Sequence, residues 1–316
     1  MKCNAVLDSG GIRGIGTIGA LNHMESKGFT WNNIAGTSVG ALIGALLVSG
    51  YTAKDLKHIT VNTDFMELLN KEGIQKSTFV GKAINFFKFN GVYCGDFIEK
   101  WIDDMLKVKG INTFSDLMNN GTCKLKIIAS DITEKRMITF PDDLYIYGFS
   151  LSNFRVSKAI RMSISIPFFF KPVEFIHGDG LSYIVDGGVC CAYPISIFDS
   201  YNDKENVPTI GFKFDNIELS NTKQGKNDPL SFLFDIADTM NKKDSKEWMT
   251  NKNIDRTILI PTLGISSTDF DLSKEKTLKL YKSGYKSAEK FLETSRKNHY
   301  FMKKTKKSVD FLIIIH

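Results

Sequence analysis

The sequence has little cysteine and little proline, and it contains no long apolar run. Five of its 316 residues are cysteine and seven are proline. The cysteines are odd in number and lack the spacing of metal ligands, which excludes a disulfide scaffold and indicates a reducing compartment. The apolar stretches at 40–48 and 311–315 are too short to cross a bilayer, and the N-terminus does not resemble a signal peptide. We therefore expect a cytoplasmic protein that contacts membranes at most peripherally.

The positive charge is concentrated near the C-terminus. The formal net charge is +6, but residues 296–316 hold six basic residues against one acidic residue, which leaves +1 for residues 1–295. A basic face that would bind nucleic acid is therefore not indicated, and we expect no nucleic-acid partner. The tail 296–316 has two interpretations, a solvated terminus or a segment that contacts anionic membrane.

Short apolar strands alternate with helices along residues 1–295. Apolar residues make up 42% of the chain and aromatic residues 12%, which is enough for a large core. Because no linker or composition break divides this stretch, we expect a single α/β domain. The expected strands are residues 4–7, 29–35, 125–130, 136–140, 183–185, 209–214 and 256–260, and the clearest expected helices are 14–27, 41–49, 96–108, 153–162 and 274–292.

The first expected strand is followed by a glycine-containing turn. Residues 8–14 read Asp-Ser-Gly-Gly-Ile-Arg-Gly, and consecutive glycines before a helix let backbone N–H groups converge on an anion. The later glycines Gly14, Gly16 and Gly19 match a dinucleotide-binding pattern. They lie too far from the strand, however, and no acidic residue follows at the required distance. We therefore assign these three glycines to close packing of the helix on the sheet.

The second strand ends in a turn that is typical of a catalytic serine. Residues 36–40 read Gly-Thr-Ser-Val-Gly, which places Ser38 between Gly36 and Gly40 and before an apolar helix. A nucleophile elbow needs this strand–turn–helix context, because the glycines permit the sharp turn that exposes the serine hydroxyl. The alternative is a serine that only caps the N-terminus of a core helix.

A serine hydroxyl is a poor nucleophile until a base accepts its proton. A Ser-His-Asp triad is not indicated, because the histidines lie on helices, in a loop or in the basic tail. The remaining option is a carboxylate that contacts the serine directly, and Asp186 at the turn 186–188 (Asp-Gly-Gly) is the candidate. An Asp with a pKa near 3.9 is a weak base, so an oxyanion hole must supply most of the transition-state stabilisation. The histidines are His23, His58, His177, His299 and His316.

Together these segments resemble the patatin-like phospholipase family. Residues 8–14 are similar to the family's Asp-Gly-Gly-Gly-x-Arg-Gly motif, 36–40 to its nucleophile elbow, and 186–188 to its Asp-Gly-Gly/Ala motif. Residues 159–167 are similar to its Ala-Ser-x-x-x-Pro region, with Met162 where alanine is commoner. The resemblance covers about residues 1–295, and the motifs are specific in combination although each is weak alone.

The resemblance implies a three-layer α/β/α fold with a mainly parallel central sheet. It also implies a catalytic dyad of Ser38 and Asp186, an acyl-enzyme on Ser38, and an oxyanion hole at Gly10 and Gly11 with Arg13 beside them. No metal and no cofactor is expected. One departure from the family pattern is Ser9, which replaces the first glycine and predicts a different entry into the hole, because serine tolerates positive φ poorly.

Three hypotheses for function follow from the resemblance. The first is a serine hydrolase that cleaves fatty-acyl esters of phospholipids or lysophospholipids. The second is a transacylase, in which an alcohol instead of water intercepts the same acyl-enzyme. The third is a lipid-binding module in which Ser9 has impaired the hole. The phenylalanine-rich segment 60–120 is interpreted either as a lid over an acyl-chain cleft or as ordinary core.

Overall fold

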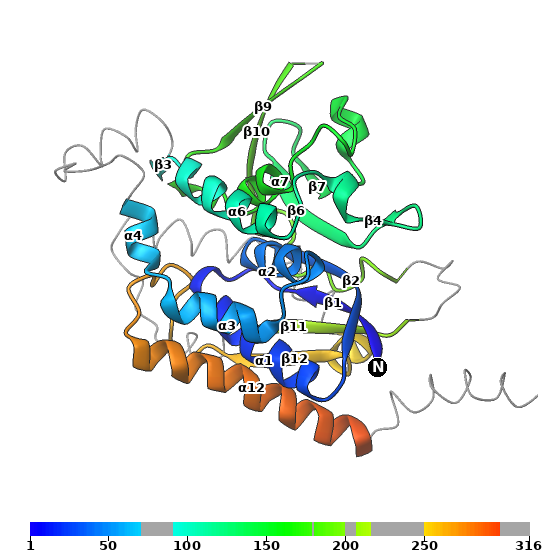
Figure 1. The fold of residues 1–316 in the computed structure, drawn as a ribbon, viewed down its shortest axis with the longest axis vertical. Helices are drawn as coiled ribbons and strands as arrows, with labels where there is room; N and C mark the ends of the chain where they lie inside the picture. Colours follow the sequence, from blue (N-terminus) through cyan, green and yellow to red (C-terminus); the bar gives the residue numbers. More distant parts are fainter. Residues whose placement is uncertain (71–90, 179, 200–206, 216–249, 298–316) are drawn as a thin grey trace, which may run out of the picture.

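A mixed sheet of eight strands lies at the centre of the protein as described (Figure 1). The structure is a computed structural model that describes residues 1–70, 91–178, 180–199, 207–215 and 250–297. The strand order is β12-β11-β1-β2-β6-β10-β9, and β7 pairs with β6 off this path. Pairing is parallel from β12 to β6 and antiparallel among β6, β7, β10 and β9. The strands are β1 (Lys2–Leu7), β2 (Thr30–Thr37), β6 (Leu125–Asp131), β7 (Arg136–Phe140), β9 (Val173–His177), β10 (Gly180–Asp186), β11 (Thr209–Asp215) and β12 (Thr257–Pro261).

Helices and short two-stranded ribbons surround this sheet. The ribbons are β3 (Gly91–Tyr93) with β8 (Phe168–Phe170), and β4 (Met118–Asn119) with β5 (Thr122–Cys123). The described α-helices are α1 (Gly14–Ser26), α2 (Val39–Val48), α3 (Ala53–Asn62), α4 (Phe65–Asn70), α6 (Asp96–Val108), α7 (Val156–Ser163), α11 (Asn251–Ile254) and α12 (Lys274–Lys297). The 3-10 turns are η1 (Gly11–Arg13), η2 (Phe114–Leu117), η3 (Leu144–Tyr147) and η4 (Gly187–Val189).

The main core lies between one face of the sheet and the helices α1, α2, α7 and α12. Alternate residues of β1 such as Ala5 and Leu7 point into this core, whereas Val6 and Ala35 of β2 point to the opposite face. The segment 192–198 covers that second face. The mainly parallel α/β fold is thus confirmed. The described residues place these helices on one face, so the second helical layer of the expected three-layer arrangement stays a prediction.

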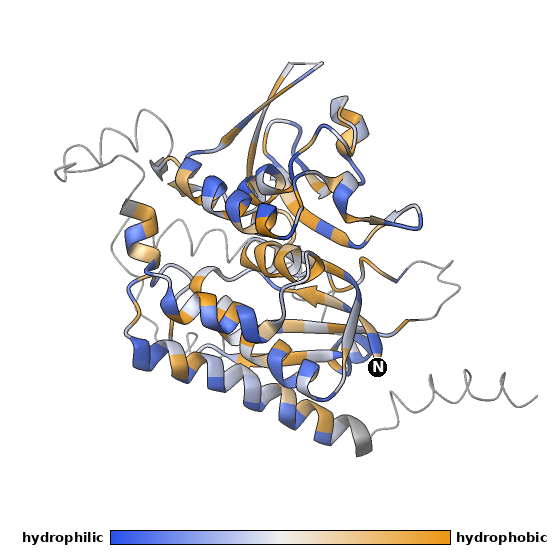
Figure 2. Ribbon diagram, in the orientation of Figure 1, coloured by the Kyte–Doolittle hydropathy of each residue, from blue (hydrophilic) through white to orange (hydrophobic). Residues whose placement is uncertain are grey.

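The helix α2 consists almost entirely of apolar residues, as Figure 2 shows. It packs on β2 and β6 in the middle of the sheet and carries Ile43 and Leu46 into the core. A helix that is apolar on nearly every side is stable in water only when it is buried on nearly every side. The burial of α2 therefore places its first residue, Val39, and the turn before that residue in the middle of the sheet, at the carboxyl ends of the parallel strands.

The three glycines of the dinucleotide-like pattern serve close packing in the structure. A Cβ on Gly16 would lie 2.9 Å from Ile260 of β12, and one on Gly19 would lie 2.0 Å from the carbonyl oxygen of Tyr281 on α12. A Cβ on Gly14 would lie 2.5 Å from Val39. The packing interpretation holds, but α1 packs on α12 and α2 as well as on the sheet.

The start of α3 and the end of α1 are each marked by a capping feature. Thr52 and Asp55 form a capping box at the start of α3, and Gly28 has a φ of +81° just after α1. The strand β10 begins at Gly180, three residues before the expected start, because it pairs with the unexpected strand β9. His177 consequently ends a strand, and the expected surface loop at this position is wrong.

Two expected features fall wholly or partly outside the described residues. Phe79, Phe86, Phe87 and Phe89 of the expected lid and residues 298–316 of the basic tail are outside, so lid closure and tail–membrane contact stay predictions. Within 60–120, the helix α6 places Ile102 and Leu106 in the main core. Across the described ranges, no helix is long and apolar enough to cross a bilayer.

Candidate active site

The sheet brings Ser38 and Asp186 to the same place from two strands. Thr37, the last residue of β2, pairs with Ile128 of β6, and Asp186 at the end of β10 pairs with the next residue, Ala129. The two candidate residues therefore flank β6 at adjacent register positions. A Cβ on Gly187 would lie 2.2 Å from the carbonyl oxygen of Ile128 and 2.9 Å from Thr37. Only glycine permits this close approach of the two strand ends.

The turn at Ser38 has the geometry of a nucleophile elbow. Ser38 has φ 55° and ψ −122°, and it directly precedes α2. Non-glycine residues adopt this left-handed region rarely and at a cost of about 1–3 kcal/mol. A Cβ on Gly36 would lie 2.3 Å from the backbone of Gly40, and one on Gly40 would lie 2.5 Å from the carbonyl oxygen of Leu7. The two flanking glycines are therefore required by the packing of the turn against itself and against β1.

The turn after β1 lies beside this elbow and offers two backbone donors. The N–H of Ile12 donates to Ser267 O at 3.0 Å, and that of Arg13 donates to Gly10 O at 3.1 Å. Within the ranges that the structure describes, the N–H groups of Gly10 and Gly11 donate to no protein acceptor. Two adjacent free N–H groups next to a nucleophile form the type of site that stabilises an oxyanion.

Steric contacts and Arg13 fix the shape of this turn. Gly11 has a φ of +54°, and a Cβ there would lie 2.0 Å from Ser267 O. The buried guanidinium of Arg13 donates through Nε to Gly10 O at 3.2 Å and lies 5.3 Å from the ring centroid of Phe214. Arg13 therefore bonds a carbonyl oxygen of the turn and none of its N–H groups. The N–H groups of Gly10 and Gly11 stay without a protein acceptor in the described structure.

Ser9, the departure from the family motif, fits this turn without strain. It is absent from the residues with positive φ, and its N–H donates to Ala192 O at 3.0 Å. The expected difference in entry geometry therefore does not arise from a strained Ser9. Because the Ser9 N–H is already bonded, the candidate backbone donors of this turn are Gly10 and Gly11.

Asp186 is a buried carboxyl group whose environment makes it unusually basic. Its residue is 5% exposed, and Oδ1 accepts from Gly188 N at 2.7 Å. Burial raises the pKa of Asp186 to about 6, against smaller lowering effects of the Ser38 hydroxyl and the Gly188 N–H. Oδ2 is buried and has no partner of good hydrogen-bond geometry in the described structure. The Ser38 hydroxyl is thus near enough to lower the pKa of this carboxyl group, and Oδ2 has no hydrogen-bond partner among the described residues.

No described histidine is bonded to either candidate catalytic residue. His23 is buried on α1 and contacts the Tyr285 ring edge-on at 4.6 Å between centroids, while His58 is exposed on α3. His177 lies 3.2 Å from the Ser182 hydroxyl, far along the β9–β10 hairpin. His299 and His316 lie outside the described residues. Among the described side chains, no group of three or more His, Cys, Asp or Glu is arranged to hold a metal ion.

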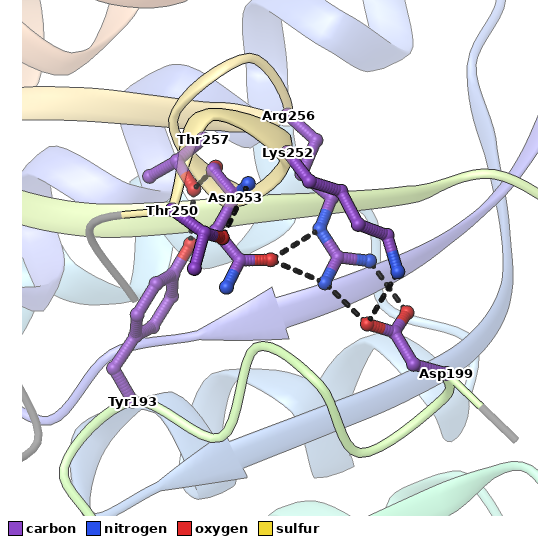
Figure 3. A network of polar contacts seen from close by, with 7 residues as sticks. All are labelled: Tyr193, Asp199, Thr250, Lys252, Asn253, Arg256 and Thr257. Carbon is purple, nitrogen blue, oxygen red and sulfur yellow. Dashed lines mark hydrogen bonds and ion pairs between the residues drawn. The ribbon is translucent and has the colours of Figure 1, made fainter. Parts of the chain in front are cut away.

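The segment that follows Asp186 is held by a polar network on its far side (Figure 3). The Arg256 guanidinium makes two bonds of 2.6 Å to Asp199 and also donates to Asn253 Oδ1. The hydroxyls of Tyr193 and Thr257 lie 2.9 Å apart. These contacts fasten the segment 187–199 to β12 and α11. Because this segment supplies the acceptor for Ser9 N, the network also supports the turn at residues 8–13, the candidate oxyanion turn.

Two serines near the site were not singled out from the sequence as functional. The Ser163 hydroxyl accepts from Ser38 N at 2.9 Å, and Ser165 O accepts from Asp186 N at 2.8 Å. Both belong to the segment 159–167, whose resemblance to the family was the one sequence signal that pointed to this region. The motif resemblance pointed to residues 159–167, but it did not predict the hydrogen bonds of Ser163 and Ser165.

Comparison with known proteins agrees with this arrangement. The family described as Patatin-like phospholipase matches residues 5–199. The uncharacterized protein YqhO of Bacillus subtilis (strain 168) is 34% identical over 293 residues, which cover 93% of this chain and 99% of YqhO. The probable lipid hydrolase 463L of Invertebrate iridescent virus 6 is 25% identical over 204 residues, 64% of each chain.

A solved structure has the same fold. The crystal structure of VipD from Legionella pneumophila matches with a TM-score of 0.55 and 18% identity, over 92% of this chain and 67% of that one. The family match spans more than half of the chain and includes the oxyanion turn, the elbow and the Asp186 turn. The chain therefore belongs to the patatin-like phospholipase family.

Proposed function

We propose that this protein is a lipid acyl hydrolase that cleaves fatty-acyl esters of phospholipids or lysophospholipids with a dyad of Ser38 and Asp186. The observation that carries the proposal is the convergence of a strained serine, a basic buried carboxylate and two free N–H groups at one strand edge. Ser38 and Asp186 are 2% and 5% exposed, so bulk water is largely excluded from the reacting groups.

In the first step, Ser38 Oγ attacks the ester carbonyl carbon while Asp186 accepts the hydroxyl proton. The carbonyl oxygen becomes an oxyanion that accepts hydrogen bonds from the N–H groups of Gly10 and Gly11. The tetrahedral intermediate then collapses, the bond to the leaving alcohol breaks, and Asp186 returns the proton to the alcohol oxygen. The product is an acyl-enzyme on Ser38 and a free lysolipid or glycerol compound.

In the second step, water attacks the acyl carbon and gives its proton to Asp186. The same two N–H groups hold the second oxyanion. Collapse breaks the bond to Ser38 Oγ, which takes the proton back from Asp186, and the fatty acid leaves. The transacylase reaction differs only in that an alcohol replaces water, so product analysis with an added lysolipid acceptor separates the two outcomes.

The pKa of Asp186 removes a weakness of an Asp base. A carboxylate with the ordinary pKa of about 3.9 accepts a hydroxyl proton poorly, and basicity rises with pKa. Burial raises the pKa of Asp186 to about 6, close enough to neutral pH for the group to be both ionised and basic. No Lys or Arg of the described chain forms an ion pair that would reverse this shift.

The substrate class is supported by the family and by a relative. The matching family is described as patatin-like phospholipase, and the relative 463L is named a probable lipid hydrolase.

A fluorophosphonate probe together with a panel of lipid esters tests the proposal. We expect the wild type to be labelled and to release fatty acid, and Ser38→Ala to lose both, with turnover lower by roughly 10⁴-fold or more. The matched control is Ser49→Ala, because Ser49 is also buried and bonds Ala45 O at the opposite end of α2. Labelling that survives in Ser38→Ala, or hydrolysis that does, would refute the assignment.

A further inference from the structure

We propose that Ser163, the last residue of α7, is a positioning residue that holds the Ser38 backbone in place relative to Asp186. This inference rests on the proposed function, since it assigns Ser163 an effect on the reaction only through Ser38. The hydrogen bonds of the Ser163 hydroxyl are with backbone groups, the N–H of Ser38 and the carbonyl oxygen of Ile128.

The Ser163 hydroxyl is used in both directions. Oγ accepts from the N–H of Ser38 at 2.9 Å and donates to the carbonyl oxygen of Ile128 at 2.5 Å. Ser163 is fully buried, at 0% exposure. A hydroxyl is the smallest side-chain group that both accepts and donates, so it joins the end of β2 to the middle of β6 in one step. Alanine at this position would leave a buried donor and a buried acceptor without their partner.

The bonded N–H belongs to the strained residue of the elbow. A φ of 55° at Ser38 is unfavourable for a non-glycine residue, so surrounding contacts must favour this conformation over a relaxed one. The Ser38 N–H donates to the Ser163 hydroxyl in the strained conformation of the elbow, because that conformation sets the direction of the N–H group. Relaxation of the turn would therefore break this bond in a region that water does not fill, which favours the strained conformation.

The same end of α7 also holds the other member of the dyad. Ser165 lies two residues after Ser163, and its carbonyl oxygen accepts from Asp186 N at 2.8 Å. Ile128, the acceptor of the Ser163 hydroxyl, pairs with Thr37 and immediately precedes Ala129, which pairs with Asp186. One short turn thus fixes both dyad residues against the same stretch of β6.

Arg161 immobilises this turn. Its guanidinium bonds the Ser165 hydroxyl, Cys94 O at 2.5 Å and Lys171 O at 2.9 Å, and it is 3% exposed. A Cβ on Gly95 would collide with the guanidinium at 2.0 Å. The contacts of Arg161 therefore connect the turn to residues beside β3 and β8, so that Ser163 acts from a fixed base.

The experiment compares Ser163→Ala with Ser157→Ala. Ser157 lies on the same helix, is also 0% exposed, and donates to Asp103 Oδ1 at 3.0 Å, away from the elbow. For Ser163→Ala we expect kcat on a soluble ester and the rate of fluorophosphonate labelling to fall about tenfold to a hundredfold. The KM should change by less than about threefold. For Ser157→Ala we expect both rates to stay within about threefold of the wild type, whatever its thermal stability.

A rescue variant separates positioning from general destabilisation. Ser163→Thr keeps the hydroxyl, and we expect it to recover at least part of the rate lost in Ser163→Ala. The inference is overturned if Ser163→Ala loses no more rate than Ser157→Ala, or if Ser163→Thr is no faster than Ser163→Ala. If Ser163→Ala yields no folded enzyme, Ser163→Cys replaces it under the same criteria, since a thiol bonds only weakly. The proposed function fails separately, through labelling of Ser38→Ala.

Discussion

Two buried aspartates lie at the carboxyl ends of two strands of the same sheet, and they differ in the charges beside them. Asp8 follows β1 and Asp186 ends β10, and each is 5% exposed. Burial raises the pKa of both carboxyl groups. Lys213 Nζ lies 3.6 Å from Asp8, whose carboxylate also accepts from Phe214 N at 3.1 Å. Asp186 has no ion pair within the described chain.

Under the proposed mechanism, this difference gives the same residue type two roles in one fold. A buried carboxylate next to a cation has its charge compensated, so it is suited to hold structure. Asp8 accordingly joins the start of the oxyanion turn to β11. At Asp8 the charges of Lys213 and Arg13 oppose the effect of burial on the pKa, whereas at Asp186 only hydrogen bonds oppose it. A raised proton affinity without a compensating cation is the property that a base needs. Neighbouring side chains, and not burial itself, make the distinction.

The largest expected difference between the two aspartates is in turnover after each is replaced by asparagine. Asp186→Asn removes the proton acceptor, so we expect kcat to fall by roughly 10²–10⁴-fold. Asp8→Asn keeps an oxygen that can accept from Phe214 N and leaves the dyad unchanged, so kcat per folded enzyme should stay within about threefold. Steady-state kinetics on a soluble ester, with the folded fraction measured by circular dichroism, decides the matter. Near-normal turnover in Asp186→Asn would show that another base is used.

The next effect is a loss of activity at low pH. Because burial raises the pKa of Asp186 to about 6, the carboxylate becomes protonated, and unable to accept a proton, below that pH. We expect kcat/KM to be flat near pH 7–8 and to fall by about tenfold for each pH unit well below 6. The residual activity of Asp186→Asn should lack this break. A wild-type profile that stays level down to pH 4.5 would contradict the shift.

The smallest expected effect is on stability at pH 7, where we expect Asp186→Asn to be more stable than Asp8→Asn. The folded-state pKa of Asp186 lies above the ordinary value, so the folded protein binds more protons between about pH 4 and 6, and stability falls as pH rises through this window. Removing the charge in Asp186→Asn should therefore stabilise the protein, by about 1–3 kcal/mol. Asp8→Asn removes the ion pair between Asp8 and Lys213, which offsets the gain.

Thermal unfolding at pH 7 and at pH 4 tests this order. At pH 7 the unfolding midpoint of Asp186→Asn should exceed those of the wild type and of Asp8→Asn. At pH 4 Asp186 is protonated in the wild type. The unfolding midpoint of Asp186→Asn should therefore exceed that of the wild type by less at pH 4 than at pH 7. Equal midpoints for the two variants at pH 7 would mean that Lys213 does not distinguish the two sites.

Much of the local structure follows from the sequence, because its causes are local. The capping box of Thr52 and Asp55 and the helix α6, observed at the expected residues 96–108, depend on residues within a few positions of one another. The strand β9 was missed for the converse reason. Five residues between a proline and a glycine form a strand here because β10 pairs with them, and that partner is not part of the local pattern.

The sequence by itself determined the chemical groups of this protein: a serine between two glycines, a glycine turn after the first strand, and an aspartate before two further glycines. These choices are local, because glycine is needed where the backbone turns sharply or is approached closely. Only the tertiary structure decided that Lys213 lies beside Asp8 while no cation of the described segments lies beside Asp186, and that the Ser163 hydroxyl accepts from the Ser38 N–H. Charge compensation and burial depend on segments distant in the chain, so they arise only when the sheet brings those segments together.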